Sequence, residues 1–193
     1  MTRADARRNQ QRLLRAAVEH ILEVGPEPSL DAIARRAGVG IGTLYRHYPD
    51  RTALLNAVAN HVLEHAITAA RTALAEAPTG YDALRQYMQA AFEHGVGVLN
   101  ILHHIEHDWS AQRAVIAPLL QAILDRCRQE GITRPDLQPA DIVIALIRFS
   151  RPALTWLPPD EERALARRHL DIYITGLATS PSTTTLRPVH IAR

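Results

Sequence analysis

Residues 29–55 read SLDAIARRAGVGIGTLYRHYPDRTALL, and this stretch holds the signals of two short helices joined by a turn. Ser29 is a suitable N-cap, and apolar residues then recur at helical spacing until Gly38 interrupts them. A second apolar pattern starts at Ile41, and a third follows Pro49. Two short helices around a glycine-containing turn make a helix-turn-helix, in which the first helix sets the angle of the second. The sequence therefore predicts this motif.

The second helix of the motif has a polar face whose chemistry suits a DNA duplex. Gly42 permits close approach of the backbone to DNA, and Thr43 can donate to a phosphate or place its methyl group against thymine. Tyr45 and His47 offer a phosphate donor and a flat contact surface. Arg51 begins the next helix, where free backbone N–H groups also favour a phosphate. The sequence therefore predicts binding to double-stranded DNA.

The distribution of charge supports a polyanionic partner for the first quarter of the chain. All 22 basic residues are arginine, whose planar guanidinium makes paired contacts with phosphates and guanine edges. Residues 1–51 contain 9 Arg and 6 acidic residues, a net charge of +3, whereas the remainder carries −1. A GC-rich genome would also favour arginine codons, so the uneven distribution is the stronger observation.

The rest of the sequence predicts further helices and no strand. With 193 residues, 47% of them hydrophobic, the chain can bury a core, and its single cysteine excludes an internal disulfide. The longest unbroken apolar run, residues 142–147, is too short to cross a bilayer. Periodicity predicts helices over residues 6–24, 29–38, 41–48, 50–63, 81–107, 110–130, 141–157 and 160–177. We expect a DNA-binding domain over 1–55, a helical domain over 56–178 and a disordered tail over 179–193.

Residues 37–48, AGVGIGTLYRHY, resemble the DNA-binding motif of the tetracycline-repressor-like (TetR) family of bacterial transcription regulators. The family's run is alanine, glycine, valine, a small residue, any residue, glycine, threonine, leucine, tyrosine, any residue, histidine and an aromatic. The chain departs from the commonest residues at Gly40, where the family more often has serine, at Tyr48 for phenylalanine and at Arg51 for lysine. The departure at Gly40 removes one possible phosphate contact. The resemblance covers residues 10–60.

This resemblance implies an all-α homodimer of nine helices, with an N-terminal three-helix helix-turn-helix domain and a larger helical domain for ligand binding and dimerisation. The last two long helices would form the dimer interface. The single cysteine points to a reducing cytoplasm. We expect a non-enzymatic regulator, a repressor that a small-molecule effector releases from DNA, and its operator should be palindromic because specific binding generally needs two half-sites. The residues assigned to DNA binding are Ser29, Arg36, Gly40, Gly42, Thr43, Tyr45, Arg46, His47, Tyr48 and Arg51.

Aromatic and polar residues of the central helices are candidates for the effector pocket. They are Tyr87, Met88, Phe92, Leu99, His103, Trp109, Arg148, Phe149 and Trp156. An ordinary core role is the favoured alternative for any one of them, because apolar residues at helical spacing form cores as well as pockets. Arg148 and Arg151 lie inside an apolar helical pattern. We expect them to pair with interface carboxylates or with a ligand anion, since a buried unpaired charge is costly.

Two alternatives involve metal ions. Residues 103–107, HHIEH, match H-x-x-E-H, a signature of zinc peptidases, which gives a helical metal-dependent hydrolase as one alternative. The other is a metal-responsive regulator that uses the histidines of residues 94–107. A chain with 10 histidines matches such a pattern easily by chance, and solvated histidines explain it as well, so we assign neither a metal nor a cofactor. The single Cys127, flanked by arginines, is either a reactive redox thiol or an inert one.

Overall fold

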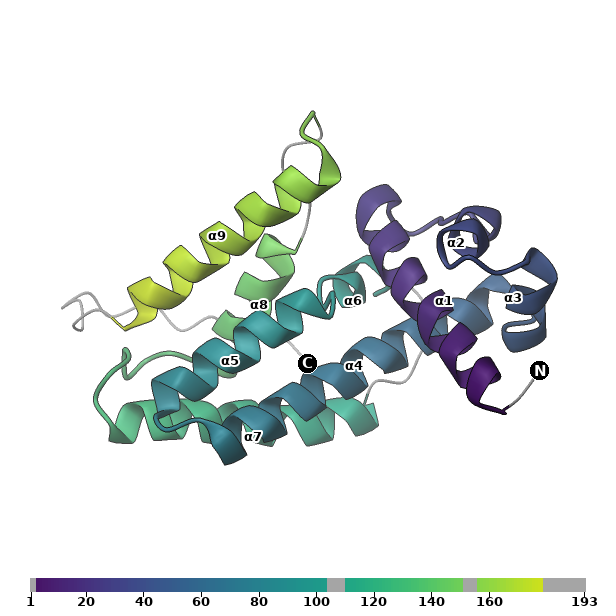
Figure 1. Ribbon diagram of the computed structural model, residues 1–193. Helices are drawn as coiled ribbons and strands as arrows, with labels where there is room; N and C mark the ends of the chain where they lie inside the picture. Colours follow the sequence, from purple (N-terminus) through teal and green to yellow (C-terminus); the bar gives the residue numbers. More distant parts are fainter. Residues whose placement is uncertain (1–2, 104–109, 151–155, 179–193) are drawn as a thin grey trace.

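The computed structural model describes residues 3–103, 110–150 and 156–178, and within these ranges it consists of nine α-helices without a strand (Figure 1). The helices are α1 (Arg3–Val24), α2 (Leu30–Arg36), α3 (Ile41–His47), α4 (Arg51–Glu76), α5 (Gly80–Glu93), α6 (Val98–Ile101), α7 (Ser110–Gln129), α8 (Pro139–Phe149) and α9 (Pro159–Leu177). The all-α prediction is confirmed for this part of the chain. The tail predicted to be disordered lies outside the described residues.

Helices α1 to α3 and the start of α4 contain the predicted helix-turn-helix. The Ser29 hydroxyl caps α2 by accepting a hydrogen bond from the Ala32 N–H at 3.3 Å, and the Asp50 carboxylate accepts one from the Ala53 N–H of α4 at 2.7 Å. Gly38 adopts φ 65° in the turn between α2 and α3, a conformation that favours glycine. The caps at Ser29 and Asp50 and the turn at Gly38 therefore lie at the helix boundaries that the sequence predicts.

A small apolar core fixes α3 against its neighbours. Ile33 of α2, Leu44 of α3 and Leu13 and Ile21 of α1 are all fully buried. Burial of each such side chain contributes about 1.5–3 kcal/mol to folding. One side of α3 is thereby anchored, and its other residues remain available to a partner.

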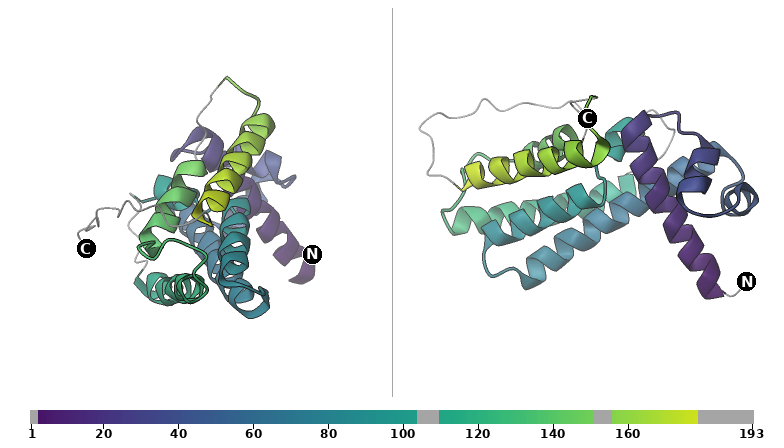
Figure 2. Two further views of the ribbon diagram at one scale, coloured as in Figure 1. Left: turned by 90° about the vertical axis from the view of Figure 1, so that its left-hand side faces the viewer. Right: turned by 45° about the horizontal axis from the view of Figure 1, so that its top comes forward.

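Helix α4 continues through the boundary that we expected between residues 55 and 56. It is a single helix of 26 residues that leaves the N-terminal helices and enters the body of the molecule (Figure 1). Its buried face is rich in small side chains, including Ala66, Ala70 and Ala73, which lets neighbouring helices approach closely. Helices α5 and α7 pack along it (Figure 2). The N-terminal and C-terminal parts therefore share one continuous element.

Helices α8 and α9 complete the body by covering α5 on the side away from α4 (Figure 2). Tyr87 and Met88 of α5, Ile123 of α7 and Ile142 of α8 are buried between these layers. No helix among the described residues combines the length and apolarity that a membrane span needs.

Two predicted helices are shorter in the structure. The pattern over 81–107 is interrupted where α5 ends at Glu93, because Gly95 turns the chain with φ 75° before the short α6. Gly97 lies so close to α8 that an added Cβ would be 2.2 Å from the Cβ of Ser150. Gly95 thus supplies a turn, and Gly97 supplies a point of close packing. The helix predicted over 141–157 ends at Phe149, and residues 151–155 lie outside the described ranges.

Candidate nucleic-acid interface

Helix α3 presents a buried side and an exposed side, as the motif requires. Leu44 is fully buried, whereas the next residue, Tyr45, exposes 50% of its surface. Gly42 and Arg46 are exposed, and a Cβ added at Gly42 would meet nothing within 4 Å. The start of α3 can therefore approach a surface closely, with the Tyr45 ring projecting beside it.

Arg46 folds back onto its own helix and organises this face. Its Nε donates to the Gly42 carbonyl at 3.1 Å, and its Nη2 donates to the Thr43 Oγ1, also at 3.1 Å. Because the Thr43 hydroxyl accepts from Arg46, its own proton remains available for donation to a phosphate oxygen. The guanidinium also adds positive charge beside the exposed side of α3.

Four further residues assigned from the sequence flank this face. Ser29 and Gly40 are exposed at the N-caps of α2 and α3, where the Ser29 hydroxyl is engaged in capping. Arg51 is exposed at the first position of α4, beside backbone N–H groups that favour an anion. His47 is half-buried at the end of α3.

Two residues assigned to DNA binding have other roles. Tyr48 is 4% exposed and belongs to the apolar core, which also raises the pKa of its phenol, so it is not part of the exposed face. Arg36 turns towards α1, where its guanidinium donates to both carboxylate oxygens of Glu23 at 2.6 and 2.7 Å and lies 3.2 Å from Glu19. The hydrogen bond from Arg36 lowers the pKa of Glu23, and the carboxylate raises the pKa of Arg36. Arg36 thus joins α2 to α1.

The candidate effector residues are dispersed rather than gathered in one pocket. Tyr87 and Met88 are buried in the core, and Leu99 is half-buried against it. His103 is exposed, with its Nδ1 2.6 Å from the Asn100 carbonyl oxygen. Trp156 is 75% exposed, and Trp109 lies outside the described residues.

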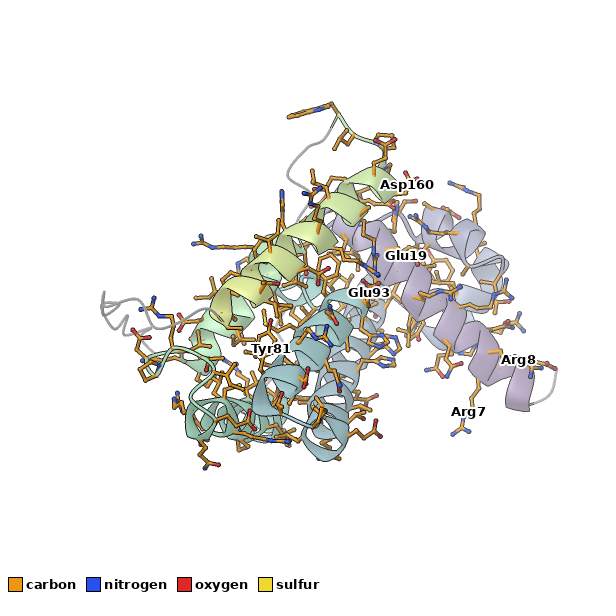
Figure 3. All side chains as sticks on the ribbon, turned by 60° about the vertical axis from the view of Figure 1, so that its left-hand side comes forward. Arg7, Arg8, Glu19, Tyr81, Glu93 and Asp160 are labelled. Atoms are coloured by element: carbon orange, nitrogen blue, oxygen red, sulfur yellow. The ribbon has the colours of Figure 1, made fainter. Side chains whose placement is uncertain are left out.

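Only Phe92 and Phe149 of this set line a common cleft. The cleft has a volume of about 590 Å³ and lies where α1 and α2 meet α5, α8 and α9. Leu22, Phe92, Phe149, Leu157 and Ala166 form its apolar lining. Its polar lining comes from Glu19, Glu23, Arg36, Ser150, Asp160, Glu162 and Arg163. Figure 3 shows Glu19 on α1, Glu93 on α5 and Asp160 on α9 around this junction.

Arg148 does not lie in the core of the single subunit, and its pairing with an interface carboxylate or a ligand anion stays a prediction. It is exposed on α8 beside Val143 and Ile144, which are themselves exposed by 39% and 40%. Ile172 on α9 is 57% exposed. Helix α8 therefore carries apolar side chains both on the side that faces the core and on the side that faces solvent. Arg151 lies outside the described residues.

The metal alternatives find no support in the described ranges, which contain no group of three or more potential ligands placed to hold a metal ion. His94 stacks on His65 of α4 instead of joining His103. Residues 104–107, which complete H-x-x-E-H, lie outside those ranges. Cys127 is buried, and burial raises the pKa of its thiol to about 11. At neutral pH this thiol is protonated, which favours the inert alternative.

Comparison with known proteins identifies relatives of this arrangement. Residues 13–58 match the family described as bacterial regulatory proteins, tetR family. The repressor LfrR of Mycolicibacterium smegmatis is 35% identical over 100 residues, which are 51% of this chain and 52% of LfrR. The chain thus spans about half the length of the curated relatives it matches.

Solved structures extend the likeness to most of the chain. The structure of LfrR in complex with proflavine, with 22% identity, a TM-score of 0.57 and coverage of 86% of this chain and 95% of that one, shares the fold. The TetR transcriptional regulator SCO0520 from Streptomyces coelicolor is 32% identical, with a TM-score of 0.61, over 88% of this chain and 98% of that chain. The chain therefore belongs to the TetR family of bacterial transcriptional regulators.

Proposed function

We propose that this protein is a ligand-responsive repressor that binds a palindromic operator as a homodimer in the cytoplasm. Residues 1–55 would read the DNA, and residues 56–178 would bind the effector and the second subunit. The observation that carries the proposal is that Tyr45 is exposed and Thr43 is half-buried on α3, directly beside the fully buried Leu44. That anchor would hold the exposed side chains at a fixed angle to the major groove.

Dimerisation follows from the small size of the reading surface. One helix-turn-helix contacts only a few base pairs, so specific binding generally needs two half-sites about 34–36 Å apart or a multiple of that distance. The exposed apolar side chains of α8 and α9, Val143, Ile144 and Ile172, are the proposed contact with the second subunit. A two-fold symmetric pair would present two copies of α3 to a palindrome.

The cleft that Phe92 and Phe149 line is the proposed effector site. Its apolar lining suits the hydrophobic part of a small molecule. Arg36 of α2 and Glu23 of α1 both line it and are hydrogen-bonded to each other, which connects the cleft to the helix-turn-helix. An effector that binds better when α1 and α2 are displaced would shift the protein towards a form with the wrong spacing for the operator. LfrR, which shares the fold, was solved with the small molecule proflavine.

Selection of bound sequences from random DNA tests the function as a whole. We expect enrichment of an inverted repeat, and a dimer on each duplex in sedimentation experiments. Enrichment of no sequence above background would contradict the proposal, as would a monomer bound to a single half-site.

Replacement of the exposed side chains tests the assigned reading face. We expect Tyr45→Ala and Thr43→Ala each to lower operator affinity about tenfold, because each removes a contact worth about 1–3 kcal/mol. Electrophoretic mobility shift measures this loss, and circular dichroism and sedimentation should show an unchanged fold and dimer. Unchanged affinity in both variants would contradict the assignment of the DNA-binding surface to α3.

Arg51 is expected to contribute a phosphate contact without base specificity. Arg51→Ala should weaken binding to specific and random DNA alike, and reduce the slope of log affinity against log salt by about 0.9. Arg71→Ala is the matched control, because Arg71 is also exposed on α4 but lies 20 residues further along, about 30 Å away. An equal change of slope in both variants would indicate a general charge effect.

A further inference from the structure

A second groove lies between α1 and the body, outside the proposed reading face. Its volume is about 660 Å³. One wall carries Arg8, Arg12 and Arg15 of α1, whose spacing places them on a single face of that helix. The opposite wall carries three histidines, His61 and His65 of α4 and His94 at the end of α5.

The three imidazole rings form one cluster. The ring centroids of His61 and His65 are 4.4 Å apart in an edge-to-face arrangement, and those of His65 and His94 are 4.2 Å apart and stacked. Burial, together with the neighbouring His65 and His94, lowers the pKa of His61 to about 4. Burial and His65 also lower the pKa of His94. Burial therefore disfavours the charged forms of His61 and His94.

The acidic groups that face the cluster are already engaged by arginines. Glu19 of α1 lies 3.2 Å from Arg36, and Glu93 of α5 is paired with Arg163 and Arg167 of α9. Arg163 itself also lines the groove. The lining thus brings four arginines against two carboxylates, each of which has an arginine partner, and Arg8 is itself paired with Asp5. Such an excess of positive groups favours an anion.

We infer that this groove binds a phosphate-bearing small molecule between the α1 arginines and the imidazole cluster. Arginine forks match phosphate oxygens in pairs of hydrogen bonds, and protonated imidazoles donate from both ring nitrogens. The negative charge of the bound phosphate group would offset the mutual repulsion of protonated histidines and so raise their pKa values. Binding would therefore be accompanied by proton uptake, and the affinity would increase as the pH falls.

The groove also has a direct connection to the reading head. Arg12 lines the groove, and its Nη2 donates to the Gly38 carbonyl in the turn of the helix-turn-helix at 3.3 Å. A phosphate bound to the Arg12 guanidinium would therefore compete with the hydrogen bond that joins α1 to this turn. Occupancy of the groove would consequently influence the position of α2 and α3.

Calorimetric titration of the DNA-free, full-length protein with inorganic pyrophosphate tests the inference independently of operator binding. We expect saturable binding that is about tenfold tighter near pH 6 than near pH 7.5, because a bound anion would raise the lowered pKa values of His61 and His94 into this range. Titrations in two buffers of different ionisation enthalpy should show net proton uptake. Absence of saturable binding, or binding without proton uptake, would overturn the inference.

Three variants distinguish this site from general charge attraction. Arg15→Gln should weaken pyrophosphate binding about tenfold, since it removes a charge-assisted contact, and Arg71→Gln, an exposed arginine of α4 outside the groove, should not. His61→Gln should flatten the pH dependence and reduce proton uptake, because the lowered pKa of His61 is the one that a bound anion would raise. Equal weakening by Arg15→Gln and Arg71→Gln would overturn the inference. So would a result in which Arg15→Gln alters only the salt dependence of operator binding, because the groove would then hold DNA phosphates.

Discussion

Ile144→Asp is expected to convert the protein to a monomer and to lower operator affinity by at least about 100-fold. In a two-fold symmetric interface each substitution occurs twice, so two carboxylates would be buried among apolar side chains without partners. Ile144 is 40% exposed on α8, and a side chain at this position faces solvent unless a second subunit covers it. Sedimentation velocity measures the loss of the dimer, and mobility shift measures the loss of operator affinity.

Val115→Asp provides the matched control for this substitution. Val115 is a β-branched residue with 37% exposure on α7, away from the proposed α8 and α9 contact. The same change of charge there should leave both the dimer and operator binding intact. The opposite result, a monomer with Val115→Asp and a dimer with Ile144→Asp, would move the interface to α7.

In the proposed dimer, the subunit interface and the reading face would depend on each other through helix α4. One subunit presents one α3, and the affinity gained from a second half-site requires that the two copies keep a fixed separation. Because α4 runs unbroken from Arg51 into the body, a shift of the body relative to α1 changes the direction in which α3 points. The cleft and the second groove both lie against α1, so a ligand in either of these proposed sites would act where α1 meets the body.

Local signals account for the parts of the structure that the sequence predicts well. Ser29, Gly38 and Asp50 each act within a few residues, through a cap or a turn, and the helices begin and end accordingly. The helix predicted over 81–107 breaks at the glycines at 95 and 97, where the chain packs against α1 and against Ser150 at the end of α8, and periodicity does not reveal this packing.

Residues whose roles depend on distant partners could not be placed from sequence. Tyr45 and Tyr48 have the same chemistry three residues apart, and only the fold shows that the first is exposed and the second buried. Arg36 pairs with Glu23 on another helix, which removed it from the reading face. His94 was grouped with the histidines that follow it, whereas α4 and α5 bring it to His65, 29 positions earlier. Such pairings require the packing angle between helices, which periodicity does not give.

The sharpest test of the helical packing is Gly80, at the start of α5. Its N–H donates to both carboxylate oxygens of Glu130 at 2.8 and 2.7 Å. The nearby Arg126 donates to the carbonyls of Ala77 and Pro78 at 2.9 and 2.7 Å, which ties the loop between α4 and α5 to α7. A Cβ at Gly80 would lie 2.5 Å from the backbone nitrogen of Cys127. Backbone cannot give way as a flexible side chain can, so α5 and α7 would have to separate.

We therefore expect Gly80→Ala to lower the free energy of unfolding by about 3 kcal/mol, at the upper end of the usual cost of overpacking. For a chain of this size, that loss corresponds to a fall in Tm of about 6–12 °C. Gly42→Ala is the control, because Gly42 is also helical but has nothing within 4 Å of an added Cβ. It should leave stability unchanged or raise it by up to about 1 kcal/mol, since alanine favours helix more than glycine does. Thermal unfolding without DNA, at one fixed protein concentration, compares the two variants. Equal stability of Gly80→Ala and the wild type would mean that α5 and α7 do not approach as closely as the structure shows.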